Sequence, residues 1–200
     1  MSTADADQIE HLRRLWEQYG RLLTVAVVAT LLAVFGKQFY GSYQQRQAVQ
    51  SAALYATYQQ SPDEAVAAQL RTEYPRSSYA TFVTLAQAKQ AIEAGKPDSA
   101  ESHLRWVAKH AGASNDRALA SLRLARVLLD QGKAGEALGV LGKDIPATSP
   151  ALAEIRGDIA DAQDKPQEAR LAYQEALAGL PSESGQAAVL KLKLDALGHP

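Results

Sequence analysis

Histidines are the residues of this sequence whose type and spacing first suggest metal chemistry. The four are His11, His103, His110 and His199. His103 and His110 are seven residues apart, a spacing that places two side chains on one face of a helix. A zinc site needs a third protein ligand, and the sequence places none with this pair. We therefore expect no metal and no cofactor, and interpret the histidines as solvated surface residues.

Acidic residues form the second group that could do chemistry. Glu154, Asp158, Asp161 and Asp164 recur at helical spacing, so they share one side of a predicted helix. They form either an acidic patch on the inner surface of a helical array or an ordinary solvated helix face. We favour the solvated face, because charged residues along a helix usually face solvent.

Catalytic motifs are absent from the sequence. It has no phosphate-binding glycine loop, no H-E-x-x-H and no G-x-S-x-G. It has no cysteine either, which excludes a disulfide framework, a thiol nucleophile and thiolate-bound metals. The formal net charge is -1 without a basic face, which argues against a nucleic-acid partner. We predict a protein that is not an enzyme and has no small-molecule substrate.

One apolar stretch, Leu22 to Gly36, separates a short leader from the rest of the chain. A membrane helix needs roughly 20 residues, and Tyr19 to Tyr40 supplies that length if Arg21 and Lys37 extend their charges to the lipid headgroups. Aromatic residues suited to the two membrane interfaces flank the stretch. They are Trp16, Tyr19, Phe39, Tyr40 and Tyr43.

A buried core helix and a cleavable signal peptide are the alternatives to an uncleaved anchor. Apolar residues surround the helix on all sides, which disfavours a one-sided surface helix. The leader is long and acidic for a signal peptide, and no small-residue cleavage site follows Phe35 closely. We therefore predict a leader at residues 1–20, a transmembrane helix at 21–41 and a soluble domain at 42–200.

Orientation in the membrane follows from the positive residues beside the span. Arg13, Arg14 and Arg21 precede it, whereas only Lys37 and Arg46 follow it closely. Because positive residues accumulate on the cytoplasmic side, this small excess favours a cytoplasmic N-terminus.

The soluble domain contains a repeat in which a small residue is followed twelve positions later by alanine. The pairs are Ala88 with Ala100, Ala125 with Ala137, and Gly157 with Ala169. A turn lies between the members of each pair: Gly95-Lys96, Gly132-Lys133 and Asp164-Lys165. Small residues let two antiparallel helices approach closely, and a large residue four positions after the alanine fills the space beside them. These large residues are Leu104, Leu141 and Tyr173.

This spacing predicts tetratricopeptide-like helical hairpins, whose period is about 34 residues. Successive units here are 37 and 32 residues apart (Ala88 to Ala125, Ala125 to Gly157), so the array is irregular. A weaker unit with Ala53 and Ala65 precedes them, and residues 182–197 read as a terminal capping helix. The fold class is thus all-α: a transmembrane helix, then an irregular α-solenoid of three to four hairpins with a capping helix.

Helix boundaries are marked by proline, serine and glycine. Helices are expected to begin at Pro62, Pro97, Pro150 and Pro166, with Ser61 and Ser149 as N-caps. Helices are expected to end near Gly95, Gly112, Gly132 and Gly179.

A groove for a partner peptide or helix is expected on the first helices of the hairpins, which line the inner surface of such arrays. Repeat positions assign to it Phe82, Leu85, Lys89, Leu122 and Arg126, with Leu119 beside them. The groove would be apolar and basic at the first two units and acidic, through Glu154 and Asp158, at the third. The alternative, which we favour, is that the apolar members belong to the core, as apolar residues at helical spacing usually do.

With span and repeats placed, the chain resembles the YfgM family of bacterial inner-membrane proteins. The resemblance covers nearly the whole chain and depends on the leader, the single span and two segments. The segments are LRLARVLLDQGKAGEAL (Leu122 to Leu138) and IRGDIADAQDKPQEARLAYQEAL (Ile155 to Leu177).

The resemblance implies an inner-membrane anchor with a cytoplasmic N-terminus and a periplasmic repeat domain. It implies association with the Sec translocon and with membrane-anchored periplasmic chaperones, including a parvulin-type prolyl isomerase, and it implies no catalytic residues. The function expected is a protein–protein interaction module that links emerging periplasmic or envelope proteins to chaperones. A structural adaptor for envelope assembly or cell division is the alternative.

Overall fold

The computed structural model describes residues 3–198, and within that range the chain is helical with no strand. The all-α prediction is confirmed. The helices, in chain order, are α1 (Thr3–Gln60), α2 (Glu64–Glu73), α3 (Ser78–Glu93), α4 (Pro97–His110), α5 (Ser114–Asp130), α6 (Ala134–Gly139), α7 (Pro150–Asp161), α8 (Pro166–Ala178) and α9 (Gly185–Ala196). The chain forms two compact units, which divide between Val49 and Gln50.

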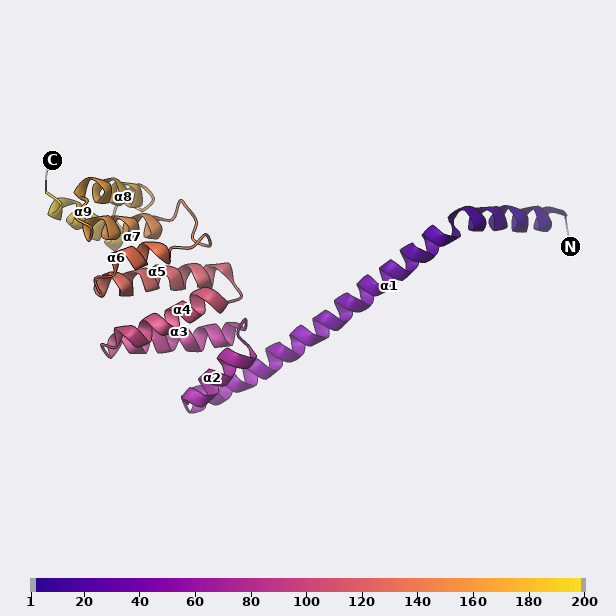
Figure 1. The fold of residues 1–200 in the computed structure, drawn as a ribbon, viewed down its shortest axis with the longest axis horizontal. Helices are drawn as coiled ribbons and strands as arrows, with labels where there is room; N and C mark the ends of the chain where they lie inside the picture. Colours follow the sequence, from indigo (N-terminus) through magenta and orange to yellow (C-terminus); the bar gives the residue numbers. More distant parts are fainter. Residues whose placement is uncertain (1–2, 199–200) are drawn as a thin grey trace. The chain divides into compact units, whose positions relative to one another are not determined.

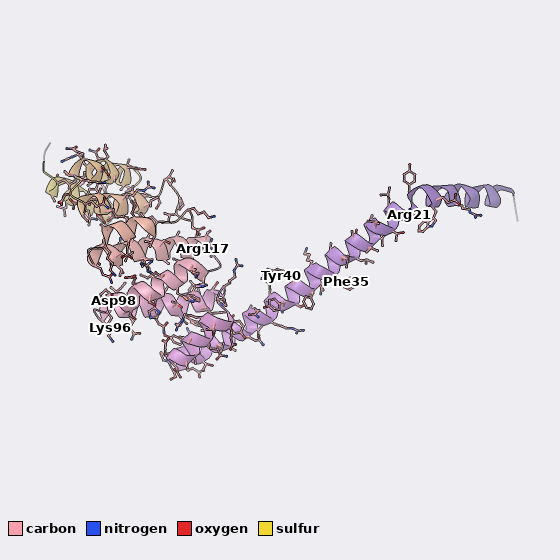
Figure 2. All side chains as sticks on the ribbon, in the orientation of Figure 1. Arg21, Phe35, Tyr40, Lys96, Asp98 and Arg117 are labelled. Atoms are coloured by element: carbon pink, nitrogen blue, oxygen red, sulfur yellow. The ribbon has the colours of Figure 1, made fainter. Side chains whose placement is uncertain are left out.

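The N-terminal unit is the first part of α1, which carries the apolar stretch. From Tyr19 onward this helix contains an 18-residue window of mean hydropathy 1.9, none of which is buried by the rest of the protein. Phe35 and Tyr40 project outward from it (Figure 2). The hydroxyls of Thr24 and Thr30 donate to the carbonyls of Gly20 and Ala26, both at 2.8 Å, so neither is left unpaired. By length and composition this helix is a possible membrane span.

The C-terminal unit is the predicted array of hairpins. Helices α3 with α4, α5 with α6, and α7 with α8 form three successive pairs, and α9 packs on α8 as the terminal helix (Figure 1). The first helices of neighbouring pairs, α5 and α7, also contact each other. Pro97, Pro150 and Pro166 occupy the first turn of their helices, as expected.

The three hairpin turns share one backbone geometry. Gly95, Gly132 and Asp164 have positive φ angles of 64°, 74° and 57°. In each turn the following lysine donates its backbone N–H to a carbonyl five residues earlier, which satisfies a carbonyl that the helix end leaves free. These bonds join Lys96 to Ala91 and Lys133 to Leu128, both at 2.8 Å, and Lys165 to Ala160 at 2.9 Å. The repeat therefore extends to the backbone conformation of its turns.

Small residues pack where the spacing of twelve predicted. Ala88, Ala125 and Gly157 are buried on the first helices, and their alanine partners are buried on the second. The closest approach is at Gly157, where an added Cβ would lie 2.4 Å from the ring of Tyr173. Glycine is therefore required at this crossing by the aromatic ring of the opposite helix.

The weaker unit that precedes the three pairs, formed by the end of α1 and by α2, departs from the prediction in register. Helix α2 begins at Glu64 rather than at Pro62, because the Asp63 carboxylate accepts the N–H of Ala65 at 2.9 Å and acts as the N-cap in place of Ser61. Ala53 and Ala65 are exposed. Buried Ala67 instead takes the position that the paired alanine holds in the other hairpins, four residues into its helix.

The second hairpin is shorter than predicted. Helix α6 ends at Gly139, so Leu141 lies beyond it, although Leu141 is still half-buried against the core. Gly135, Gly139 and Gly142 weaken the helix here, because glycine loses more backbone entropy than other residues on becoming helical.

The two loops on either side of the α5–α6 hairpin are joined by Arg117, a residue of α5 that is labelled in Figure 2. Its guanidinium donates to both carboxylate oxygens of Asp144, at 2.8 and 2.9 Å. It also donates to the carbonyls of Ala111 and Gly112, at 2.9 and 3.1 Å. The Arg117 hydrogen bonds therefore connect the α4–α5 loop with the α6–α7 loop.

Candidate interaction groove

The residues assigned to the groove lie on successive first helices, but their environments differ. The Phe82 side chain is 51% exposed, whereas Leu85 and Leu122 are half-buried and pack against the core. Lys89 is exposed and lies 3.6 Å from Glu93 on its own helix. The interpretation that the apolar groove residues belong to the core is therefore right in part for the two leucines and wrong for Phe82. Leu119, the repeat equivalent of Phe82, is also exposed, at 39%.

A cleft of about 540 Å³ opens beside Arg126, and Glu154 and Asp158, the acidic residues expected at the third unit of the groove, line it as well. Helices α5, α7, α8 and α9 all contribute to its walls. The lining residues are Arg126, Leu129, Asp130, Glu154, Asp158, Asp161, Ala162, Tyr173, Lys193 and Ala196. Four carboxylates and two cations thus surround a partly apolar cavity.

A network of charged side chains forms one wall of this cleft. The Lys193 ammonium lies 3.0 Å from Glu154 and 2.7 Å from Asp158, and it sits 5.5 Å from the centre of the Tyr173 ring. The Tyr173 hydroxyl donates to Asp158 at 2.8 Å. Lys193 therefore ties the terminal helix α9 to α7 and α8.

Glu154 is the most buried member of the network. Gln186 of α9 donates to its carboxylate at 2.9 Å, and Arg126 of α5 lies 3.5 Å from it. The interpretation of the acidic residues as a solvated face is therefore wrong for Glu154, which is 7% exposed, and for half-buried Asp158. It is right for Asp161 and Asp164, which are exposed.

The network shifts the protonation equilibria of its members. Burial alone would raise the pKa of Glu154, but hydrogen bonds from Gln186 and Lys193 outweigh it and the net pKa is lowered. Burial would lower the pKa of Lys193, but its bonds to Asp158 and Glu154 raise it. Burial, with the hydrogen bond to Asp158, raises the pKa of Tyr173. The pair of Glu154 and Lys193 is thus charged at neutral pH.

His103 and His110 do not line this cleft. His103 and His110 are half-buried, so the prediction of solvated histidines is wrong for both. Burial, followed by the charge of Arg71, lowers the pKa of His103, and the His110 ring stacks on Trp106 at 5.0 Å. Among the described residues, no group of three histidine, cysteine or acidic side chains is placed to hold a metal. The His11 side chain and His199 lie outside the described part.

Sequence reasoning missed Lys193 and Tyr173 as residues of the cleft. A signal for Lys193 was present, because Ser149 and Ser184 are the N-caps of α7 and α9. Counted from these caps, Lys193 occupies in α9 the position that Asp158 occupies in α7. The helix face that carries Asp158 therefore continues onto α9, beyond the three hairpins.

The chain is similar to known proteins over nearly its whole length. The family model described as a tetratricopeptide repeat-like domain matches residues 13–199. A Neisseria gonorrhoeae protein named ancillary SecYEG translocon subunit is 32% identical over 96% of this chain and 97% of its own. Proteins of the same name from Escherichia coli and Haemophilus influenzae are 26% and 25% identical, covering 88% and 71% of this chain and 87% and 72% of their own. No solved structure matches the chain.

Proposed function

This chain belongs to the YfgM family of ancillary SecYEG translocon subunits with a tetratricopeptide repeat-like domain, and from that membership we propose that it is a membrane-anchored, protein-binding subunit of the Sec translocon. The observation that carries the proposal is the extent of the match. Residues 13–199 include both the apolar helix and every hairpin, so the likeness extends beyond the repeats, which occur in many proteins.

The repeat domain belongs in the periplasm under this proposal, with residues 1–20 in the cytoplasm and residues 21–41 crossing the inner membrane. The apolar part of α1 supports a span, since its side chains are exposed all round. The excess of positive residues before the span supports the orientation.

Topology can be measured cleanly because the chain has no native cysteine. Two variants carry one cysteine each: Glu17→Cys before the span and Leu171→Cys on α8, both at exposed side chains. In cells with a permeabilised outer membrane, a membrane-impermeant maleimide is expected to label only L171C. E17C is expected to react only after the inner membrane is broken. Labelling of E17C alone in unbroken cells would reverse the topology and remove the periplasmic function.

The groove on α3 and α5 serves, in this proposal, to hold partner proteins. Its role is to receive emerging periplasmic or envelope proteins and to bring them to chaperones, including a membrane-anchored prolyl isomerase. Exposed Phe82 and Leu119 support this role, because apolar side chains on a repeat surface are typical contacts for an extended or helical partner segment. We assign no catalytic step to the chain.

Photo-crosslinking in living cells tests this role. A benzoylphenylalanine replaces Phe82, which is already aromatic, and the control carries it at Leu171 on α8. We expect adducts with a SecYEG subunit, a periplasmic chaperone or a prolyl isomerase from position 82 and not from position 171. The absence of all three contradicts the proposal, and adducts with division or envelope-assembly proteins favour the structural adaptor instead.

A further inference from the structure

The cleft beside α9 has two carboxylates that the fold does not neutralise. Glu154 and Asp158 are both bound to Lys193, and Arg126 lies against Glu154. Asp130 of α5 and Asp161 of α7 also line the cleft, yet neither forms an ion pair with any residue that the structure describes. Both cations of the cleft are therefore already paired, whereas two of its four anions are not.

The rest of the cleft wall is apolar. Leu129, Ala162 and Ala196 line it with the ring of Tyr173. A side chain with an apolar stem and a cationic head suits such a site, because the stem can be buried while the head stays near the carboxylates. Lys193 of the protein itself binds in this way. Its ammonium group lies over the Tyr173 ring and forms ion pairs with Glu154 and Asp158.

Apolar side chains continue from the cleft along the same face of α5. Leu122 lies about one helical turn before Arg126, and Leu119 about one turn before Leu122. Leu119 is exposed, and its repeat equivalent Phe82 is more exposed still. A partner lying on this face would meet apolar side chains first and unpaired carboxylates next.

We propose that the partner segment bound by this face carries apolar residues next to a lysine or arginine, whose cation enters the cleft between Asp130 and Asp161. This proposal rests on the protein-binding role proposed above and adds the chemistry of the partner. An acidic segment is disfavoured, because Arg126 and Lys193 are already bound by carboxylates and the lining carries a net charge of two negative units, from four carboxylates and two cations.

Peptide binding to the full-length chain in phosphatidylcholine nanodiscs tests the proposal, since this zwitterionic lipid does not itself attract cationic peptides. Three fluorescein-labelled peptides share one leucine- and alanine-rich sequence and differ only in a central lysine, glutamine or glutamate. Fluorescence anisotropy is expected to show the lysine peptide binding about three- to tenfold more tightly than the glutamine peptide, as for partly exposed ion pairs. The preference should fall as salt is raised.

The double variant Asp130→Asn and Asp161→Asn should reduce the lysine preference to nearly one. The matched control, Glu175→Gln with Glu183→Gln, changes the net charge equally at exposed positions outside the cleft and should keep the preference. Equal binding of the lysine and glutamine peptides, tighter binding of the glutamate peptide, no binding of any peptide, or a preference that survives in the double variant overturns the inference.

The crosslinking result at position 82 distinguishes a failure of the proposed partner chemistry from a failure of the proposed protein-binding role. Translocon or chaperone adducts without a lysine preference leave the protein-binding role intact and remove only the assignment of partner chemistry. The absence of those adducts removes the role itself, whichever peptide binds.

Discussion

Replacing Gly157 with valine is expected to destabilise the repeat domain by about 3 kcal/mol, the upper part of the usual range for overpacking a close crossing. The added Cβ alone would lie 2.4 Å from two ring carbons of Tyr173, nearer than atoms in contact can approach. That ring cannot easily move away, because it is 2% exposed and its hydroxyl is bound to Asp158. Thermal unfolding followed by circular dichroism should show a midpoint lowered by roughly 6–12 °C.

A matched control is available at Gly135, a helical glycine of α6 with no atom within 4 Å of its added Cβ. Gly135→Val should leave the midpoint unchanged or raise it slightly, because valine is the better helix former. Combining Gly157→Val with Tyr173→Leu should cost less than the sum of the two single changes, since the smaller side chain makes room. Equal effects of valine at 157 and 135 would show that the crossing is not tightly packed.

Replacing Lys193 with methionine is expected to destabilise the domain by about 2–4 kcal/mol at pH 7, as when one partner of a buried ion pair is removed. Glu154, which is 7% exposed, then keeps only Gln186 and the more distant Arg126. Urea unfolding measured by tryptophan fluorescence gives the difference in free energy of unfolding. Lys191→Met is the control, because Lys191 lies on the same helix and its side chain is exposed.

The effect of Lys193→Met should depend on pH in a defined direction. In the natural chain the pKa of Glu154 is lowered, so its stabilising contribution is present above the ordinary glutamate pKa of 4.5 and is lost as pH falls through the folded-state pKa below it. In the Lys193→Met variant, burial favours the protonated form of Glu154, so lowering the pH reduces the destabilisation. The difference in free energy of unfolding between the natural chain and the Lys193→Met variant should therefore shrink from pH 7 towards pH 4.5. A difference that stays constant, or that Lys191→Met reproduces, would contradict this account.

The repeat was predictable from the sequence because its requirements are local. A crossing of two helices needs small residues at Ala88 and Ala125, and a tight turn needs a residue tolerant of positive φ, as at Gly95 and Gly132. The α2 unit before the three hairpins was misplaced because Ser61 and Asp63 are both good N-caps, and only the packing of Ala67 selects between them.

The cleft was less predictable, because it depends on a helix outside the repeat pattern. The acidic residues of α7 have the spacing of a solvent face, and Glu154 becomes buried only when Gln186 and Lys193 of α9 cover it. The register of α9 is set by the length of the loop that precedes it, which the spacing of twelve does not determine. Phe82 had the same apolar spacing as core residues, and only the fold shows that it stays exposed.

The Arg117 hydrogen bonds have a consequence for local unfolding. Because one guanidinium holds Asp144 in one loop and the carbonyls of Ala111 and Gly112 in another, any displacement of Arg117 releases both loops together. We therefore expect the two loops that interrupt the regular period to open together, although about 30 residues separate them in sequence. The irregularity of the array is therefore concentrated in a single region at one end of the α5–α6 hairpin.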